Sequence, residues 1–174
     1  MDLVVKAGGH ARWGERSMRC TVGRSGITAA KREGDGATPA GLWPMRRILY
    51  RPDRLTMPPS RLAATAILED DGWCDGAADP LYNRPVKLPY AGRHERLWRA
   101  EPLYDLIVVL GHNDDPVVPG AGSAIFLHRA RADWGPTEGC VALALSDLLL
   151  VAAEASAGDR VLVLPSPTPS PAEG

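Results

Sequence analysis

The sequence predicts a single, mainly β domain, and three observations lead to this prediction. Glycine and proline account for 18 and 16 of the 174 residues, about a fifth of the chain against a usual share nearer 12%. Short runs of aliphatic and β-branched residues recur between these turn-forming residues. Helix signals are scarce. We therefore expect many turns, short strands and few helices.

Seven apolar runs are the expected strands. The run at 105–111 contains five adjacent apolar residues, which suits a strand that is buried on both faces. Two further strong candidates lie at 124–128 and 159–165, the second ended by its proline. The remaining candidates are 3–6, 18–22, 46–50 and 65–69.

Helix signals occur at two places. Ser146 and Asp147 are expected to cap a helix of about ten residues, and Gly158 is expected to stop it. A weaker helix is expected over 93–100, where the chain runs toward a proline. Both helices are short, in keeping with a mainly β domain.

We expect one domain over residues 1–165, because no composition break or internal period divides that stretch. Residues 166–174 are expected to form a disordered tail, since their alternate prolines withhold hydrogen-bond donors from a sheet or helix. Two Gly/Pro-rich segments, 23–41 and 70–89, are too long for simple turns. We expect them to be functional or mobile loops.

Charge and hydropathy exclude several function classes. With 20 Lys+Arg against 21 Asp+Glu and a formal charge of −1, no general attraction to nucleic acid or anionic membrane is expected. No apolar run approaches the roughly 18 residues that span a bilayer. Lys6, His10 and Arg12 lie where a signal peptide needs an apolar run. The sequence as given therefore shows no export signal.

Cysteine usage and ligand spacing predict neither a disulfide framework nor a metal centre. The number of cysteines is odd and no Cys-x-x-Cys pair occurs. They are Cys20, Cys74 and Cys140. The imidazoles and carboxylates between His112 and His128 lack the spacing of a metal site. We expect no metal and no cofactor.

Residues 126–150 carry the strongest chemical signal. A strand ends in His128, a Gly/Pro turn follows, and Gly139-Cys140 leads into an apolar stretch. A cysteine that directly follows glycine in a turn can present its sulfur beside backbone N–H groups, which is the layout of a nucleophile and an oxyanion hole. An imidazole from the adjoining strand would favour the thiolate. These residues alone also fit a small buried cysteine and an ordinary strand-end histidine.

Two blocks of the sequence resemble the L,D-transpeptidase (YkuD-type) catalytic domain. The family signature His … Ser/Thr-His-Gly-Cys reads here His128 … Thr137-Glu138-Gly139-Cys140-Val141. About a hundred residues upstream, the stretch KREGDGATPAGLWP at 31–44 is similar to the family segment Gly-Asp-Gly-x-Thr-Pro-x-Gly. The resemblance implies a β-sandwich or barrel of mixed sheets with one or two short helices.

The resemblance also implies roles for individual residues. Cys140 corresponds to the nucleophile and His128 to its base, while Gly139 and Cys140 would supply oxyanion-hole N–H groups and Thr137 would shape the turn. Family members attack a peptidoglycan stem peptide, form a thioester and pass the acyl group to the side-chain amine of a second stem. Stem peptides are therefore the expected donor and acceptor, and carbapenem-type β-lactams the expected covalent inhibitors. The family implies the periplasm or cell envelope, whereas the sequence as given shows no export signal. The localisation therefore stays open.

Two positions depart from the family pattern. Glu138 replaces the usual histidine, and its carboxylate is expected to oppose ionisation of the nearby thiol. Ala142 replaces an arginine, so Arg129 or Arg131 becomes the candidate cation for a substrate carboxylate. Two alternatives stay open for these reasons. One is an L,D-carboxypeptidase or amidase that hydrolyses the same peptides, and the other is a catalytically idle peptidoglycan-binding module.

The segment 111–123 joins the best strand to the strand that carries the candidate base. His112, Asn113 and Ser123 are candidates to hold a substrate peptide by hydrogen bonds. The alternative is that the segment only forms turns, because Asn-Asp-Asp-Pro and Pro-Gly are strong turn formers.

Overall fold

The mainly β architecture is confirmed by a computed structural model that describes residues 1–57 and 59–165. The expected tail at 166–174 lies outside the described residues. Nine strands form the main sheet: β1 (Asp2–Lys6), β2 (His10–Trp13), β3 (Arg16–Thr21), β6 (Gly41–Tyr50), β7 (Ala64–Ala66), β11 (Leu106–Leu110), β12 (Phe126–Arg129), β13 (Val141–Leu143) and β14 (Arg160–Val163). Six of the seven expected strands overlap these closely, whereas the seventh ends early, at Ala66.

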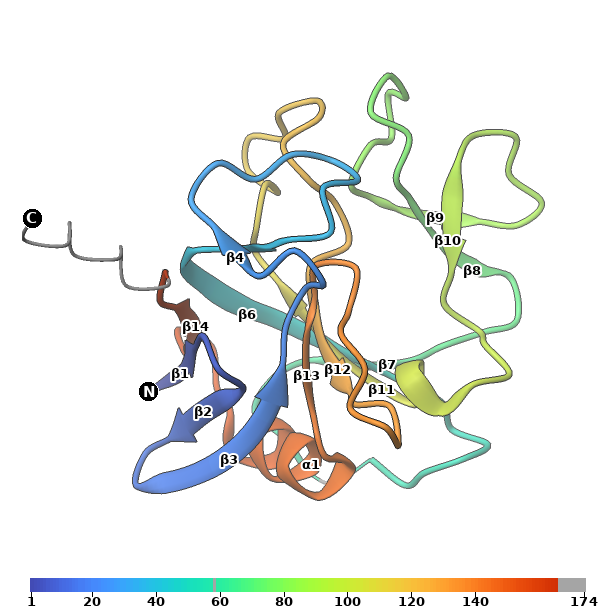
Figure 1. The fold of residues 1–174 in the computed structure, drawn as a ribbon. Coiled ribbons are helices and arrows are strands. Elements are labelled where there is room, and N and C mark those ends of the chain that lie inside the picture. Colours follow the sequence, from blue (N-terminus) through green and yellow to red (C-terminus); the bar gives the residue numbers. More distant parts are fainter. Residues whose placement is uncertain (58, 166–174) are drawn as a thin grey trace, which may run out of the picture.

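The main sheet closes on itself as a barrel (Figure 1). Closure occurs because β11 pairs with β12 along one edge and with β6 along the other, antiparallel in both cases. The sheet is mixed, since β1 pairs with β14, and β12 with β13, in parallel. This agrees with the barrel of mixed sheets that the family resemblance implies.

The strand β11 is buried on both faces, as its continuous apolar run predicts. Its alternate residues enter two different apolar clusters, because successive side chains of a strand point to opposite faces. Leu106, Val108 and Leu110 lie in the large cluster that fills the barrel. Ile107 and Val109 lie in a second cluster that also contains Cys140. The barrel wall thus separates the main core from the candidate site.

The α-helix α1 (Leu145–Glu154) packs its buried residues Leu148 and Val151 against the main core. It starts earlier than expected, because β13 leads into it almost directly. Ala144 occupies the N-cap position and makes no side-chain hydrogen bond there, so the prediction that Ser146 and Asp147 cap the helix is wrong. Among the described residues, no helix is long and apolar enough to cross a membrane.

The prediction of a helix over 93–100 is also wrong, because this segment contains a short strand and no helix. β10 (His94–Arg96) pairs with β8 (Asp71–Cys74), which pairs in turn with β9 (Pro85–Lys87), so the expected 70–89 loop contributes two strands to a small three-stranded sheet. A 3-10 helix, η1 (Pro102–Tyr104), follows. The strand β10 forms because it pairs with residues about twenty positions earlier in the chain. Local helix signals cannot predict such pairing.

The second expected loop, 23–41, carries two short paired strands, β4 (Ile27–Thr28) and β5 (Thr38–Pro39). An isolated bridge joins Gly23 to Thr137. The loop that contains the upstream sequence block is therefore held against the turn that precedes Cys140.

Candidate active site

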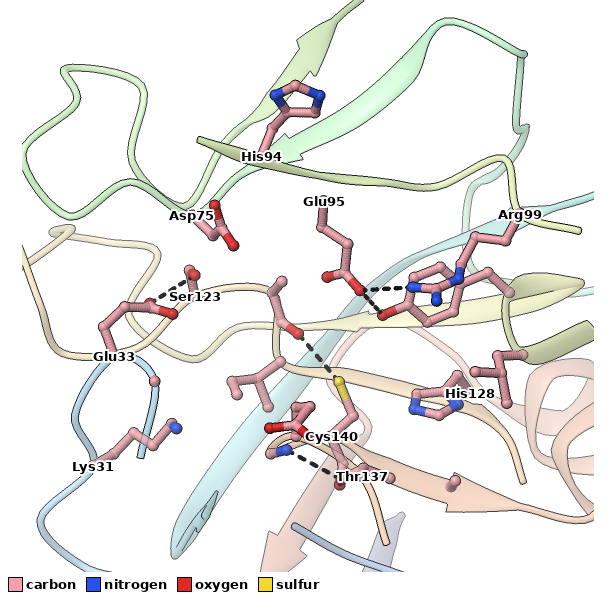
Figure 2. Close-up of a pocket in the computed structure, with 18 of the residues that line it drawn as sticks. Lys31, Glu33, Asp75, His94, Glu95, Arg99, Ser123, His128, Thr137 and Cys140 are labelled. Atoms are coloured by element: carbon pink, nitrogen blue, oxygen red, sulfur yellow. Dashed lines mark hydrogen bonds and ion pairs between the residues drawn. The ribbon is translucent and has the colours of Figure 1, made fainter. Parts of the chain in front are cut away.

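The register of β12 and β13 places Cys140 and His128 on one face of the barrel wall. The strands run parallel, with Leu127 beside Val141 and His128 beside Ala142. Cys140 therefore lies beside Phe126, and the alternation of side chains puts it on the same face as His128. Both residues line one pocket, and both side chains are labelled in the close-up of that pocket (Figure 2).

The Cys140 thiol is buried, with 8% of the residue exposed. Its Sγ donates to the Ala124 carbonyl at 3.2 Å and accepts the Phe126 N–H at 3.4 Å. Burial, followed by the negative charge of Glu95, raises the pKa of the thiol to about 12, although the Phe126 N–H and Lys31 act in the opposite direction. The thiol is therefore neutral at pH 7 in the free protein.

His128 is also neutral. Burial lowers the pKa of its imidazole to about 4, although a hydrogen bond to the Arg129 carbonyl opposes the shift. Nδ1 lies 2.8 Å from that carbonyl oxygen, which can only accept, so Nδ1 carries the proton and Nε2 keeps a free lone pair. The ring packs edge-on against Tyr104, with 5.4 Å between centroids. The resting pair is thus a thiol and an imidazole, and the thiolate expected from sequence is not the resting form.

The Arg129 side chain points away from the thiol and does not line the pocket. Its Nη1 lies 3.2 Å from the buried carboxylate of Asp105, which also pairs with Arg54 at 2.9 Å. Arg129 therefore supports the wall behind His128. Of the two arginines expected to meet a substrate carboxylate, Arg131 alone lines the pocket.

The turn before Cys140 is fixed by the Thr137 hydroxyl. Its Oγ1 donates to the Cys140 carbonyl at 2.7 Å and accepts the Gly139 N–H at 3.1 Å. Gly139 has φ +140°, and a Cβ there would lie 2.9 Å from the Ala37 carbonyl. Only glycine fits this position without displacing backbone. Thr137 thus shapes the turn, while the Gly139 N–H is already engaged.

The upstream block meets the same turn through Thr38, which is fully buried. Its Oγ1 donates to the Cys140 carbonyl at 3.2 Å and accepts the Gly23 N–H at 2.8 Å. The two sequence blocks that resemble the family are therefore parts of one hydrogen-bonded unit around Cys140.

Asp35 of the upstream block organises a buried cation. It accepts the N–H groups of Arg32 and Ala37 and pairs with Lys31 Nζ. Burial alone would raise the pKa of Asp35, but these hydrogen bonds lower it below its ordinary value. The Lys31 side chain is 7% exposed and lines the pocket. Sequence analysis did not single out this lysine, although it begins the block that did attract notice.

The pocket has a cavity volume of about 410 Å³ and a polar, charged lining. It brings together six of the residues expected from sequence. They are Cys140, His128, Gly139, Thr137, Ser123 and Arg131. It also contains charged groups that sequence analysis missed, several of them labelled in Figure 2. Among these are Lys31, Glu33, Asp75, Glu95 and Arg99.

His112 and Asn113 are not brought to the pocket lining. His112 Nε2 lies 2.9 Å from the Ala121 carbonyl, and its ring packs edge-on against Trp43. The Asn113 side chain donates to the carbonyls of Val118 and Gly122. Both residues order the 111–123 connection, which is the turn-forming alternative.

Ser123 does line the pocket, and its hydroxyl donates to Glu33 Oε2 at 2.7 Å. The Tyr82 hydroxyl donates to the same oxygen at 2.5 Å. Ser123 therefore meets a carboxylate that the sequence did not single out.

The carboxylate that opposes ionisation of Cys140 is Glu95, which corrects the expectation for Glu138. The Glu138 side chain is 80% exposed and pairs with Arg24 at 2.9 Å, so solvent screens it. Glu95 escaped notice because β10 was predicted to be a helix and carries no local motif. Within residues 1–57 and 59–165, no group of three or more His, Cys, Asp or Glu side chains is arranged to hold a metal ion.

Fold and site together define a mainly β barrel domain with a buried cysteine and histidine at the base of a charged pocket. The chain belongs to the YkuD family, the L,D-transpeptidase catalytic domain, whose family model matches residues 3–163. Comparisons with curated proteins and with solved structures gave no significant match. At the level of the family, membership supports an L,D-transpeptidase-type function that acts on peptidoglycan peptides.

Proposed function

We propose that this protein is a cysteine acyltransferase that acts on peptidoglycan stem peptides through a Cys140 thioester. The observation that carries the proposal is that Cys140 and His128 lie on one face of the barrel wall and line the same pocket of about 410 Å³. The tautomer of His128 supports it, because Nε2 is the nitrogen left to accept a proton. We assign this catalytic domain to residues 1–165.

Acylation begins from a neutral pair. The thiol leaves its hydrogen bond to the Ala124 carbonyl, and its proton passes to His128 Nε2 as Sγ attacks the donor carbonyl. Moving the proton during attack avoids a free thiolate, which burial and Glu95 disfavour. The imidazolium then gives the proton to the departing amine, and the thioester is formed.

The oxyanion of this step needs donors close to Cys140. Among the described residues, the Cys140 N–H has no hydrogen-bond partner, so it is the first donor in this proposal. The Gly139 N–H can contribute only when it is released from Thr137 Oγ1. Lys31, whose charge favours the thiolate of Cys140, stabilises negative charge on the same side.

The test is covalent labelling of the full chain with a carbapenem-type β-lactam and with a stem tetrapeptide donor. Intact-mass measurement should show one adduct per chain, absent in Cys140→Ala. Cys20→Ala is the matched control, because Cys20 is buried in the main core and does not line the pocket. An adduct that persists in folded Cys140→Ala would contradict the assignment.

The products separate the alternatives. Crosslinked dimers from donor and acceptor stems indicate transfer, and shortened monomers indicate a carboxypeptidase or amidase. A folded protein that is never acylated by either reagent would instead indicate a binding module.

A further inference from the structure

A carboxylate, Glu95, faces the nucleophile from the opposite side of the pocket (Figure 2). Glu95 lies on β10, where it pairs with Trp73 of β8. Its side chain is 27% exposed, so a ligand in the pocket can reach it. The acylation step proposed above makes no use of this group.

One oxygen of the carboxylate is anchored and the other is open. Glu95 Oε1 accepts the Tyr104 hydroxyl at 2.5 Å and lies 3.4 Å from Arg99 Nη1. Tyr104 is itself packed edge-on against His128. No donor to Glu95 Oε2 is found in the described part of the chain. The anchor fixes the carboxylate while leaving one acceptor atom for a ligand.

A second unpartnered carboxylate oxygen lies in the same pocket. Asp75 Oδ1 is buried without a hydrogen-bond partner within residues 1–57 and 59–165, and Asp75 Oδ2 pairs with Arg93 at 3.3 Å. Buried acceptors that lack donors are costly unless a ligand supplies them. Each of the two open carboxylate oxygens would form its strongest hydrogen bond with a donor that carries positive charge.

The position of Glu95 is unfavourable for the first chemical step. Its charge raises the pKa of the Cys140 thiol, and a negative charge near a thiol opposes the loss of the thiol proton that attack requires. The second step has the opposite requirement, because an amine acceptor arrives as an ammonium ion and must lose a proton before it can attack.

We propose that Glu95 binds the ammonium group of the acceptor and removes its proton, so that Glu95 makes this enzyme prefer an amine over water. The inference rests on the proposed acyl-transfer function. Burial raises the pKa of Glu95 despite its bond from Tyr104, which makes the carboxylate a better proton acceptor than an exposed glutamate.

Glu95 takes one proton from R–NH₃⁺, and the neutral amine attacks the carbonyl carbon of the thioester. The C–N bond forms and the C–S bond breaks, while the second amine proton passes through His128 Nε2 to Cys140 Sγ. The products are an amide and the free thiol, and Glu95 later releases its proton to water.

The experiment measures how the acyl-enzyme of the full chain divides between an acceptor and water. The thioester is formed on a stem tetrapeptide, and a tripeptide stem with a free side-chain amine is added at graded concentrations. In Glu95→Gln we expect the ratio of amide to hydrolysis product to fall at least about a hundredfold, the lower end for loss of a general base. Acylation of Cys140 should be as fast as in the parent or faster.

Hydroxylamine provides the matched acceptor, because it is largely uncharged near pH 7 and needs no proton removed beforehand. Glu95→Gln should leave its reaction with the acyl-enzyme almost unchanged. Glu101→Gln is the matched variant, since Glu101 is exposed, pairs with the same Arg99 and does not line the pocket. It should keep the parent ratio.

Equal losses with both acceptors, or an unchanged ratio in folded Glu95→Gln, would overturn the proposal and leave Glu95 as an anchor for Tyr104. If Glu95→Gln does not fold, Glu95→Asp serves instead. It keeps the charge but withdraws it by one methylene, and it should lower the amide ratio for the charged acceptor only. If the parent is never acylated, the proposed function itself fails, and the role of Glu95 fails with it.

Discussion

The two walls of the pocket are built differently. The Cys140 wall belongs to the barrel, and its polar groups bond mainly to backbone, as in the contacts of Cys140 with Ala124 and of His128 with Arg129. The Glu95 wall belongs to the small sheet β10-β8-β9 and η1, and it is held by bonds between side chains, as from Tyr104 to Glu95.

From this difference we expect the two walls to have separate roles, acylation for the Cys140 wall and choice of acceptor for the Glu95 wall. Backbone contacts inside a closed barrel fix geometry that few substitutions can alter, which suits a nucleophile and its base. Contacts between side chains can change without disturbing the barrel, which suits the choice of acceptor. Substitutions on the Cys140 wall should therefore affect acylation and folding, and substitutions on the Glu95 wall should affect the later partition.

The largest effect is expected for His128→Gln. Removing the base should slow acylation of Cys140 by about 10²- to 10⁴-fold, the usual range for general base catalysis, as measured by the time course of the mass adduct. His10→Gln is the control, because His10 is exposed on β2. A His128→Gln variant that is acylated at the parent rate would contradict the assignment of His128 as the base of the Cys140 wall.

Acid should have opposite effects on the stability of the two walls: it should destabilise the Cys140 wall and stabilise the Glu95 wall. The pKa of His128 falls from 6.5 to about 4 on folding, so the unfolded chain binds the extra proton and stability is lost as the pH falls from about 6.5 to 4. The loss from His128 is about 3 kcal/mol. The raised pKa of Glu95 acts oppositely and favours folding as the pH falls. Urea unfolding across this range should show a smaller acid loss in His128→Gln than in the parent.

Thr38→Val should destabilise the protein by about 1–3 kcal/mol, since it leaves the buried Gly23 N–H without its acceptor and removes a donor to the Cys140 carbonyl. Acylation should slow as well, because the turn loses a contact. Thr65→Val on β7 is exposed and should change stability little. Urea unfolding of both variants measures the difference. Equal stabilities would show that the upstream block does not support the Cys140 wall.

The smallest effect is expected for Glu138→Gln. Its exposed pair with Arg24 contributes at most about 1 kcal/mol, and the acylation rate should stay within about threefold of the parent rate. A large gain in acylation would mean that Glu138, and not Glu95, restrains the thiol. Mass-adduct kinetics on the two glutamine variants would decide between them.

The sequence by itself determined the mainly β class, most barrel strands and the Cys140 wall. Apolar runs such as 105–111 predict strands because burial on both faces leaves no polar positions. The two blocks around Asp35 and Cys140 can be recognised in the sequence because few residue types fit their key positions. Gly139 is required by its backbone geometry, and Thr38 and Thr137 by their buried hydroxyl groups.

Only the tertiary structure decided the other wall. Residues 93–100 carry weak helix signals, yet β10 forms because β8, about twenty residues away, offers partners for its backbone. Three separate segments contribute Glu95, Tyr104 and Cys140 to the pocket. Their spacing along the chain does not predict that they lie together. The neutral state of the thiol is likewise a consequence of its burial and of the nearby charge of Glu95. Folding creates both conditions.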